Sequence, residues 1–307
     1  MGENDVLTVL DGEKQKIQQA ATGNDTTEEV KQEEQLEQRT FLYDALSDEV
    51  VNRALKNLKH KLVVLIGLPS SGKSTFVGSM YHLLMTKASV GNYRILGSDT
   101  YVGLERRVYL RYAHGQNISD TKRTGSLEGH ILTMELEEKN THEMLQLFLS
   151  DRTGERYKKY ANGEANIKDD ASLLAAEHLY IFVAADTLMG NEYLSVKDKY
   201  EKIASLLKSA GVMGRTRTVT IVFNKIDLVK KTRERFMKKR ASFLESMKNV
   251  LGIDEIDNCD VQSNNMNSTG LKSLIEKLLG TAFDNQEERH ADDLDWVKRE
   301  IEKYREL

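Results

Sequence analysis

Cysteine is nearly absent from this chain of 307 residues, which contains only Cys259. A single cysteine excludes a disulfide framework and any metal site built on cysteines, and it favours the reducing cytoplasm as the location. Long apolar runs are absent as well, since the longest strand-like stretch, Leu179–Ala185, is far too short to span a membrane. The first residues carry acids instead of a basic segment before an apolar one, so we expect no signal peptide.

An excess of positive charge is also missing, because 44 lysines and arginines face 48 acids and the net charge is −4. Broad nucleic-acid binding needs basic patches, so we do not expect it, although a local patch stays open. The seven histidines are scattered without the spacing of metal ligands. Hydrophobic residues make up 39% of the chain, which is enough for one sizeable domain with appendages.

The most informative segment is a short apolar run, Leu62–Ile66, that leads into the pattern Gly-x-x-x-x-Gly-Lys-Ser. Such a run predicts a buried parallel strand, and the glycines let backbone N–H groups wrap around phosphates. The lysine would neutralise phosphate charge, and the serine hydroxyl could bind Mg²⁺. The predicted phosphate-binding residues are Gly67, Ser70, Ser71, Gly72, Lys73, Ser74 and Thr75. The alternative is an ordinary Gly/Ser turn between a strand and a helix.

Strand-like and helix-like segments alternate along the chain from this motif onward. We expect strands at 62–66, 93–96, 129–137, 143–150, 178–185, 218–223 and 258–262. We expect helices at 74–87, 100–112, 193–210, 231–250 and 269–283. This alternation predicts an α/β fold with a mostly parallel sheet and helices on both faces. Together with the phosphate-binding pattern, it indicates a sheet similar to that of P-loop NTPases. The short link between the third and fourth strands favours a hairpin, which makes one strand antiparallel.

Polar segments flank this predicted domain, which covers residues 61–285. Residues 1–25 lack periodicity and are expected to form a disordered tail, and residues 26–60 are expected to form a helical extension. Within it, apolar residues at four-residue spacing over 41–58 favour an amphipathic helix or a helix pair that packs on the domain, with docking on a partner as the alternative. Residues 286–307 carry a second apolar stripe and are expected to form a C-terminal amphipathic helix.

A second motif, Asn224-Lys225-x-Asp227, directly follows the apolar strand predicted at 218–223. The Asp227 carboxylate can accept hydrogen bonds from both the N1–H and the 2-amino group of guanine, whereas adenine would leave this charged acceptor unpaired. Asn224 can tie the base-binding loop to the phosphate-binding loop, and the Lys225 stem can cover the face of the base. A strand-ending turn that happens to contain these residues is the alternative.

A third motif, Asp151-x-x-Gly154, lies between the other two and also follows a predicted strand. An aspartate at this strand end is where P-loop nucleotide hydrolases place a group that holds the Mg²⁺ shell. Gly154 would present its backbone N–H to the γ-phosphate. The pattern is weak alone, but its order along the chain and the hairpin before it strengthen the interpretation.

With these three motifs, residues 61–283 resemble the Ras-like P-loop GTPases of the translation-factor-related (TRAFAC) class. The resemblance implies a switch I threonine before the hairpin, for which Thr124 is the first choice and Thr121 the second. Because Thr124 lies 124 − 74 = 50 residues after Ser74, the segment near 90–120 looks like an insertion that small GTPases lack.

The last motif of the class, usually Ser-Ala-Lys, reads Ser263-Asn264-Asn265 in this chain. The resemblance implies that the backbone N–H of Asn264 could still donate a hydrogen bond to guanine O6. Within the class, the amino-acid sequence of the P-loop and the long insertion resemble those of the bacterial double-GTPase group of conflict (defence) systems.

The resemblance implies a molecular switch that binds GTP, GDP and Mg²⁺, in which Ser74, Thr124 and Asp151 hold the cation and Lys73 neutralises phosphate charge. Glu155 stands where a water-orienting glutamine is common in the class. Its charge beside the γ-phosphate is repulsive, so we predict slow intrinsic hydrolysis that a partner could complete.

Arg123, next to the proposed switch threonine, is the first candidate for an internal arginine finger, and Arg152 and Arg156 are further candidates. A structural or surface role for each arginine is the alternative. Two other functions stay open for the whole chain: a GTP-gated interaction scaffold with little turnover, and a P-loop kinase that acts on a small molecule. As partners we expect the guanine nucleotide and a protein, which could be a second GTPase.

Overall fold

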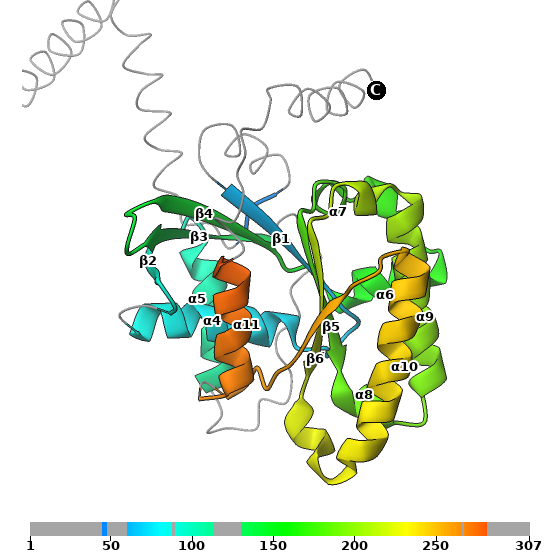
Figure 1. The fold of residues 1–307 in the computed structure, drawn as a ribbon. Coiled ribbons are helices and arrows are strands. Elements are labelled where there is room, and N and C mark those ends of the chain that lie inside the picture. The colour runs from blue at the N-terminus through cyan, green and yellow to red at the C-terminus, as the bar shows by residue number, and fades with distance from the viewer. Residues whose placement is uncertain (1–44, 48–59, 88–89, 113–129, 266, 281–307) are drawn as a thin grey trace, which may run out of the picture. The chain divides into compact units, whose positions relative to one another are not determined.

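The fold is built on one mixed sheet of seven strands, arranged in the order β2-β3-β4-β1-β5-β6-β7 (Figure 1). The computed structural model describes residues 45–47, 60–87, 90–112, 130–265 and 267–280. The strands are β1 (His60–Ile66), β2 (Tyr93–Gly97), β3 (Ile131–Glu138), β4 (Met144–Ser150), β5 (His178–Ala184), β6 (Thr218–Asn224) and β7 (Asp257–Asp260). All seven strands expected from the sequence are present, with ends that differ by a residue or two.

The sheet is parallel except at β3. Strand β1 lies between β4 and β5 and pairs in parallel with both, and the parallel pairing continues through β6 to β7. Strand β3 runs antiparallel to both of its neighbours, β2 and β4. The prediction of a mostly parallel sheet with one antiparallel hairpin strand is therefore confirmed. As a consequence, the carboxyl ends of β4, β1, β5 and β6 meet at one edge of the sheet.

Helices cover both faces of this sheet, as predicted (Figure 1). One face is covered by α4 (Lys73–Thr86), α5 (Tyr101–Tyr112) and α11 (Thr269–Gly280). The other is covered by α6 (Gly154–Asn162), α7 (Ala171–Leu174), α8 (Ala185–Met189), α9 (Tyr193–Ser209) and α10 (Arg233–Leu251). Short 3-10 turns occupy Ile167–Asp169, Val212–Gly214 and Ile226–Thr232. Of the helices described, none combines the length and the apolar character that a membrane crossing requires.

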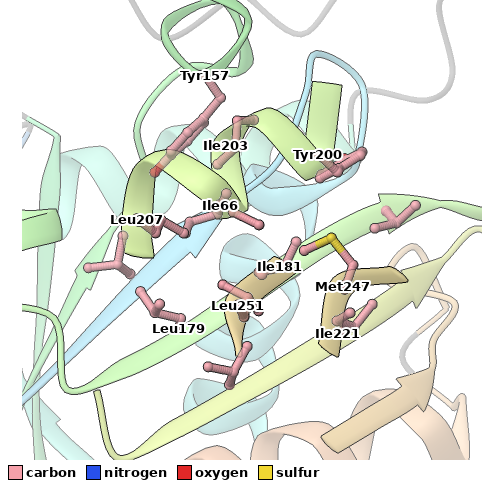
Figure 2. Packing of buried hydrophobic residues seen from close by; sticks show 14 of the residues in the cluster. Ile66, Tyr157, Leu179, Ile181, Tyr200, Ile203, Leu207, Ile221, Met247 and Leu251 are labelled. Atoms are coloured by element: carbon pink, nitrogen blue, oxygen red, sulfur yellow. The ribbon is translucent and has the colours of Figure 1, made fainter. Parts of the chain in front are cut away.

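The two apolar cores follow from the alternation of side chains along the strands. In β1, Val63 and Leu65 pack on the face of α4, whereas Val64 and Ile66 pack on the opposite face. Figure 2 shows the core on the face opposite α4, where Ile66 of β1 lies beside Ile203 and Leu207 of α9. Met247 and Leu251 of α10 lie beside Ile181 and Ile221 in the same core. Burial of each large apolar side chain contributes about 1.5–3 kcal/mol, so these cores hold the carboxyl edge of the sheet in place.

Helix α6 is the main element that is missing from the helices expected from the sequence, because the segment that follows Gly154 is rich in charged residues. Thr153 caps the helix by accepting a hydrogen bond from the backbone N–H of Arg156. Its buried side chains include Tyr157 and Tyr160, which lie three residues apart and therefore share one face. Four of the nine residues of α6 are charged, so the sequence pattern does not reveal this buried face. Strand β7 also ends at Asp260, two residues before the predicted Gln262.

Residues 45–47 are the described part of the segment expected to be helical over 41–58. The backbone N–H of Leu46 donates a 2.8 Å hydrogen bond to the carbonyl of Ile131, and Leu46 is buried against the domain. A single unbroken helix through Leu46 is therefore wrong, because its backbone is bridged to β3. The proposed tail, the rest of this extension and the C-terminal helix (1–44, 48–59 and 281–307) lie outside the described residues.

Candidate nucleotide site

The loop between β1 and α4 contains the predicted phosphate-binding motif, and α4 begins at Lys73. Ser70 and Gly72 both adopt left-handed backbone conformations, with φ of 62° and 94°. A side chain at Gly72 would also overlap the amide nitrogen of Asn224. Glycine is required at this position for both reasons, and the turn aims the first N–H groups of α4 into the loop, where they favour an anion.

The start of the loop is held tightly on the end of β5. A Cβ at Gly67 would lie 2.7 Å from the carbonyl oxygen of Phe182, so only glycine fits there. The hydroxyl of Tyr200 donates a 2.6 Å hydrogen bond to that same carbonyl and accepts a 3.2 Å bond from the N–H of Leu68. Sequence reasoning missed Tyr200, because nothing in the pattern of α9 distinguishes it from an ordinary core tyrosine.

Lys73 is almost fully buried, and its ammonium group donates a 2.7 Å hydrogen bond to the carbonyl of Gly67. The ammonium also lies 5.5 Å from the ring centre of Tyr157, within the range of a cation–π contact. Burial lowers the pKa of Lys73 to about 8, and the charges of Asp151 and Glu155 partly offset this effect. The third motif therefore lies beside the P-loop lysine, as its predicted role requires.

Gly154 packs directly on the P-loop backbone. A Cβ on this residue would lie 2.5 Å from the carbonyl carbon of Leu68 and 2.5 Å from the Cα of Pro69. Gly154 is also the first residue of α6, so its N–H belongs to a helix terminus that has no intrahelical acceptor for it. The contact places this N–H group beside the loop that would hold the phosphates.

Asp151 lies at the end of β4, next to the P-loop because β4 and β1 are neighbouring parallel strands. Its side chain is buried, and Oδ2 accepts a 2.9 Å hydrogen bond from Nε of Arg107 on α5. Its other oxygen, Oδ1, is buried without a hydrogen-bond partner in the described part of the chain. Together with the hydroxyl of Ser74 in the first turn of α4, these oxygens are the kind of ligands that Mg²⁺ prefers, so the residues present fit that cation.

Two of the three candidate finger arginines have structural partners on α6 and α7. Nε of Arg152 lies 2.5 Å from Oδ2 of Asp170, a buried carboxylate that also accepts a 2.9 Å hydrogen bond from Tyr160. Nε of Arg156 donates a 2.9 Å hydrogen bond to the same Tyr160 hydroxyl. These contacts favour the structural alternative for both arginines, because each guanidinium is held in the network that anchors α6.

Asn224 joins the second motif to the first. At the end of β6 its Nδ2 donates a 3.1 Å hydrogen bond to the carbonyl of Ser71, and its Oδ1 accepts a 3.0 Å bond from the N–H of Ser263. Ser263 is held from the other side by Ser79 of α4, whose hydroxyl donates to the Ser263 carbonyl. The contact expected between Asn224 and the P-loop is confirmed, whereas the nucleotide-binding role of these residues stays a prediction.

The side chains expected around the guanine base surround this junction. Lys225 has a left-handed backbone with φ of 59°, and its ammonium lies 3.8 Å from the carboxylate of Asp186. Asp227 is partly exposed, and its carboxylate has no hydrogen bond or ion pair to another described residue. Asn264 is exposed. The Asp227 carboxylate is thus accessible to a base.

The carboxyl edge of the sheet brings together the P-loop, Asp151, Gly154, Glu155 and Asn224, which come from three separate parts of the sequence. The proposed switch threonine, Thr124, its alternative Thr121 and the finger candidate Arg123 lie outside the described residues. Arg107 and Ser79 are contacts of this site that sequence reasoning missed. Both sit on helices at positions that look ordinary, so only their spatial neighbours reveal them.

A mostly parallel sheet with the P-loop sequence pattern between β1 and α4, and an Asn-Lys-x-Asp motif at the end of β6, is the arrangement of the P-loop GTPase class. A family model named Double-GTPase 2 matches residues 61–279, well over half of the chain. The chain belongs to the Double-GTPase 2 family and is a P-loop GTPase of the translation-factor-related class.

Two solved structures of sup35, one complexed with GDP and one with GMPPNP, also match at 15% and 16% sequence identity. They cover 68% and 72% of this chain, and both TM-scores are 0.36. The match spans less than half of each sup35 chain, 38% and 42%. No curated protein matches the chain.

Proposed function

We propose that this chain is a Mg²⁺-dependent molecular switch that binds GTP and hydrolyses it slowly without a partner. The observation that carries the proposal is the double hydrogen bond of Asn224, which joins the P-loop at Ser71 to the last motif at Ser263. A buried amide that spans both loops sets the spacing between a phosphate site and a base site, as recognition of one nucleotide requires.

Asp227 is the residue that selects guanine in this proposal. Its accessible carboxylate would accept hydrogen bonds from the N1–H and the 2-amino group, and both bonds are charge-assisted. Adenine offers neither donor at those positions, so it would leave a desolvated carboxylate unpaired, which is costly. The Lys225 stem would cover the face of the base, and Asn264 would supply a backbone N–H to guanine O6.

Lys73 is the residue that neutralises phosphate charge. Its ammonium already lies inside the loop on the carbonyl of Gly67, so little reorganisation is needed to reach a phosphate oxygen. Ser74, Asp151 and Thr124 would hold Mg²⁺, which supplies further positive charge to the phosphates when bound. The N–H of Gly154 would donate a hydrogen bond to the γ-phosphate. Hydrolysis removes that phosphate and would thereby release the third motif.

Glu155 is the reason to expect slow hydrolysis. Its charge partly offsets the effect of burial, which lowers the pKa of Lys73, and this supports a position of the Glu155 carboxylate at the phosphate end of the proposed site. A carboxylate near an anionic γ-phosphate is repelled, and it would orient a water molecule less well than a neutral amide. A protein partner, which could be a second GTPase, would then complete the reaction.

Asp227→Asn tests the base-binding part of the proposal. We expect at least about tenfold weaker GTP affinity in this variant, because an unpaired or mismatched polar group is left against the base. Xanthosine nucleotides should gain affinity, because the new amide can donate to the 2-oxo group. Asp198→Asn, at an exposed carboxylate of α9, is the matched control and should bind GTP like the wild type. Unchanged GTP affinity in Asp227→Asn would contradict the assignment.

The wild-type rate tests the catalytic part. Phosphate release from GTP should be far slower than the roughly 1–10³ s⁻¹ of typical enzymes, and removal of Mg²⁺ should stop it. A rate within that range without any partner would refute slow intrinsic turnover. Tight binding with no phosphate release would instead support the second candidate function, a GTP-gated interaction scaffold, which Glu155 also favours. A role in a bacterial defence system and a cytoplasmic location stay predictions of the sequence.

A further inference from the structure

A buried ion pair connects the third motif to the segment that looks like an insertion. Arg107 belongs to α5, and its Nε donates a 2.9 Å hydrogen bond to Oδ2 of Asp151. Nη1 of the same guanidinium donates a 2.8 Å hydrogen bond to the carbonyl of Gly103, one turn earlier on α5. Only 9% of the Arg107 side chain and 1% of the Asp151 side chain are exposed, so the charges are largely removed from water.

The packing of α5 on α4 determines where Arg107 lies. A Cβ at Gly78 of α4 would lie 3.0 Å from the carbonyl oxygen of Arg107, so the two helices approach closely at this point. Leu104 and Val108, on either side of Arg107 in the sequence of α5, are buried in the core that α4 shares. Gly78 lies one helical turn after Ser74, and the guanidinium contacts Asp151, so α5 packs close to two of the residues expected to hold the cation.

Both partners keep an unused hydrogen-bonding group. Nη2 of Arg107 and Oδ1 of Asp151 are each buried without a hydrogen-bond partner among the residues the structure describes. In a native protein such atoms are uncommon and call for an explanation. A carboxylate with one oxygen bound to a guanidinium and the other unbound is suited to a second positively charged ligand.

We propose that Arg107 is a positioning residue of the nucleotide site, which neutralises Asp151 when no divalent cation is bound and thereby weakens the dependence of nucleotide binding on Mg²⁺. The proposal rests on the proposed function. A buried carboxylate without a counter-charge is costly, and the charge of Asp151 also acts on Lys73 of the P-loop. With Arg107 present, a bound cation stabilises the Asp151 carboxylate less. The cation must either compete with Arg107 for this carboxylate or share the carboxylate with it.

The Mg²⁺ dependence of GDP binding tests this role on the full chain. Binding of a fluorescent GDP analogue is measured against Mg²⁺ concentration for the wild type and for Arg107→Gln. We expect the variant to need at least about tenfold less Mg²⁺ for half-maximal tightening, which is a coupling of ordinary size. Arg107→Lys, which keeps the charge, should restore most of the wild-type behaviour. Arg106→Gln, at the exposed neighbouring position of α5, is the control and should match the wild type.

Thermal unfolding without nucleotide tests the pair separately. Arg107→Gln should melt several degrees below the wild type, and Arg107→Gln combined with Asp151→Asn should recover much of this loss, because the carboxylate charge that Arg107 had paired is then removed as well. If Arg107→Gln does not fold, the double variant and Arg107→Lys still provide the comparison. No recovery in the double variant would contradict the pairing.

Failure of the proposed function and failure of the Arg107 role give different results in these experiments. A wild-type chain that binds no GDP at any Mg²⁺ concentration refutes the proposed function. A wild-type chain that binds GDP with the same Mg²⁺ requirement as Arg107→Gln refutes only the role of Arg107. Equal effects of Arg106→Gln and Arg107→Gln would also overturn it, since they would reflect a general loss of positive charge on α5.

Discussion

Asn224→Ala is the substitution that most directly tests how the candidate site is held together. The Asn224 side chain is buried, and both ends of its amide bind backbone groups: the carbonyl of Ser71 and the N–H of Ser263. Alanine at this position removes the donor and the acceptor together. The two backbone groups then stay buried without their partner, since Ser71 and Ser263 are each about 2% exposed.

The size of the effect follows from these two groups. A buried polar group that loses its hydrogen bond costs about 1–3 kcal/mol, so we expect Asn224→Ala, which leaves two such groups, to lower the free energy of unfolding by about 2–6 kcal/mol. For a domain of this size, such a loss corresponds to a melting temperature lower by roughly 5–20 °C. The nucleotide-free protein should already show the loss, because the bonds lie within the chain.

Urea denaturation of nucleotide-free protein measures this loss, and repetition with saturating GDP measures the additional loss of binding. Thr220→Val is the matched control, because Thr220 lies in the same strand and its hydroxyl is buried without a hydrogen-bond partner in the described ranges. Removal of that unpaired hydroxyl should be neutral or stabilising. If Asn224→Ala costs less than about 1 kcal/mol, or no more than Thr220→Val, the reasoning is refuted.

Two further predictions concern Gly154 and Lys61. Gly154→Ala would place a methyl group 2.5 Å from the carbonyl carbon of Leu68 and 2.3 Å from the backbone nitrogen of Pro69, so GTP affinity should fall at least about tenfold. Gly214→Ala, which meets no atom within 4 Å, should bind normally in the same titration. Burial lowers the pKa of Lys61 from 10.5 to about 7 in the folded chain. Between these two pH values the unfolded chain therefore binds the proton of Lys61 more strongly than the folded chain does. The contribution of Lys61 to the free energy of unfolding consequently rises with pH in this range. The stability of the wild type relative to Lys61→Met should therefore increase from about pH 7 to about pH 9.5, and an equal difference at both pH values in urea denaturation would contradict the argument.

Much of the fold was predictable because its signals are local. The strand Leu62–Ile66, the loop after it and helix α4 are encoded in consecutive residues, and the family match to residues 61–279 agrees with that interpretation. The hairpin of β3 and β4 was predictable from the short link between two apolar runs. Helix α6 was not, because its buried tyrosines stand among charged residues that suggested a polar loop.

The contacts of Arg107 and Tyr200 could not have been predicted from the sequence. Arg107 lies 44 residues before Asp151, and Tyr200 lies 132 residues after Leu68. Neither residue belongs to a recognisable pattern, and a buried tyrosine or a helical arginine has many ordinary uses. Their roles depend on which helix packs over which strand end, which is a property of the folded chain.

The sequence by itself determined which residues are proposed for the chemistry of this protein: those expected to wrap phosphates, the carboxylate expected to recognise guanine, and the order in which they occur. Those properties depend on residue types at short spacing, where the backbone imposes the geometry directly. Only the tertiary structure decided how the motifs are joined, through Asn224 between two loops and Arg107 on Asp151. Such contacts close long loops, and the chain forms them because burial on both faces of the sheet compensates for the conformational entropy that it loses.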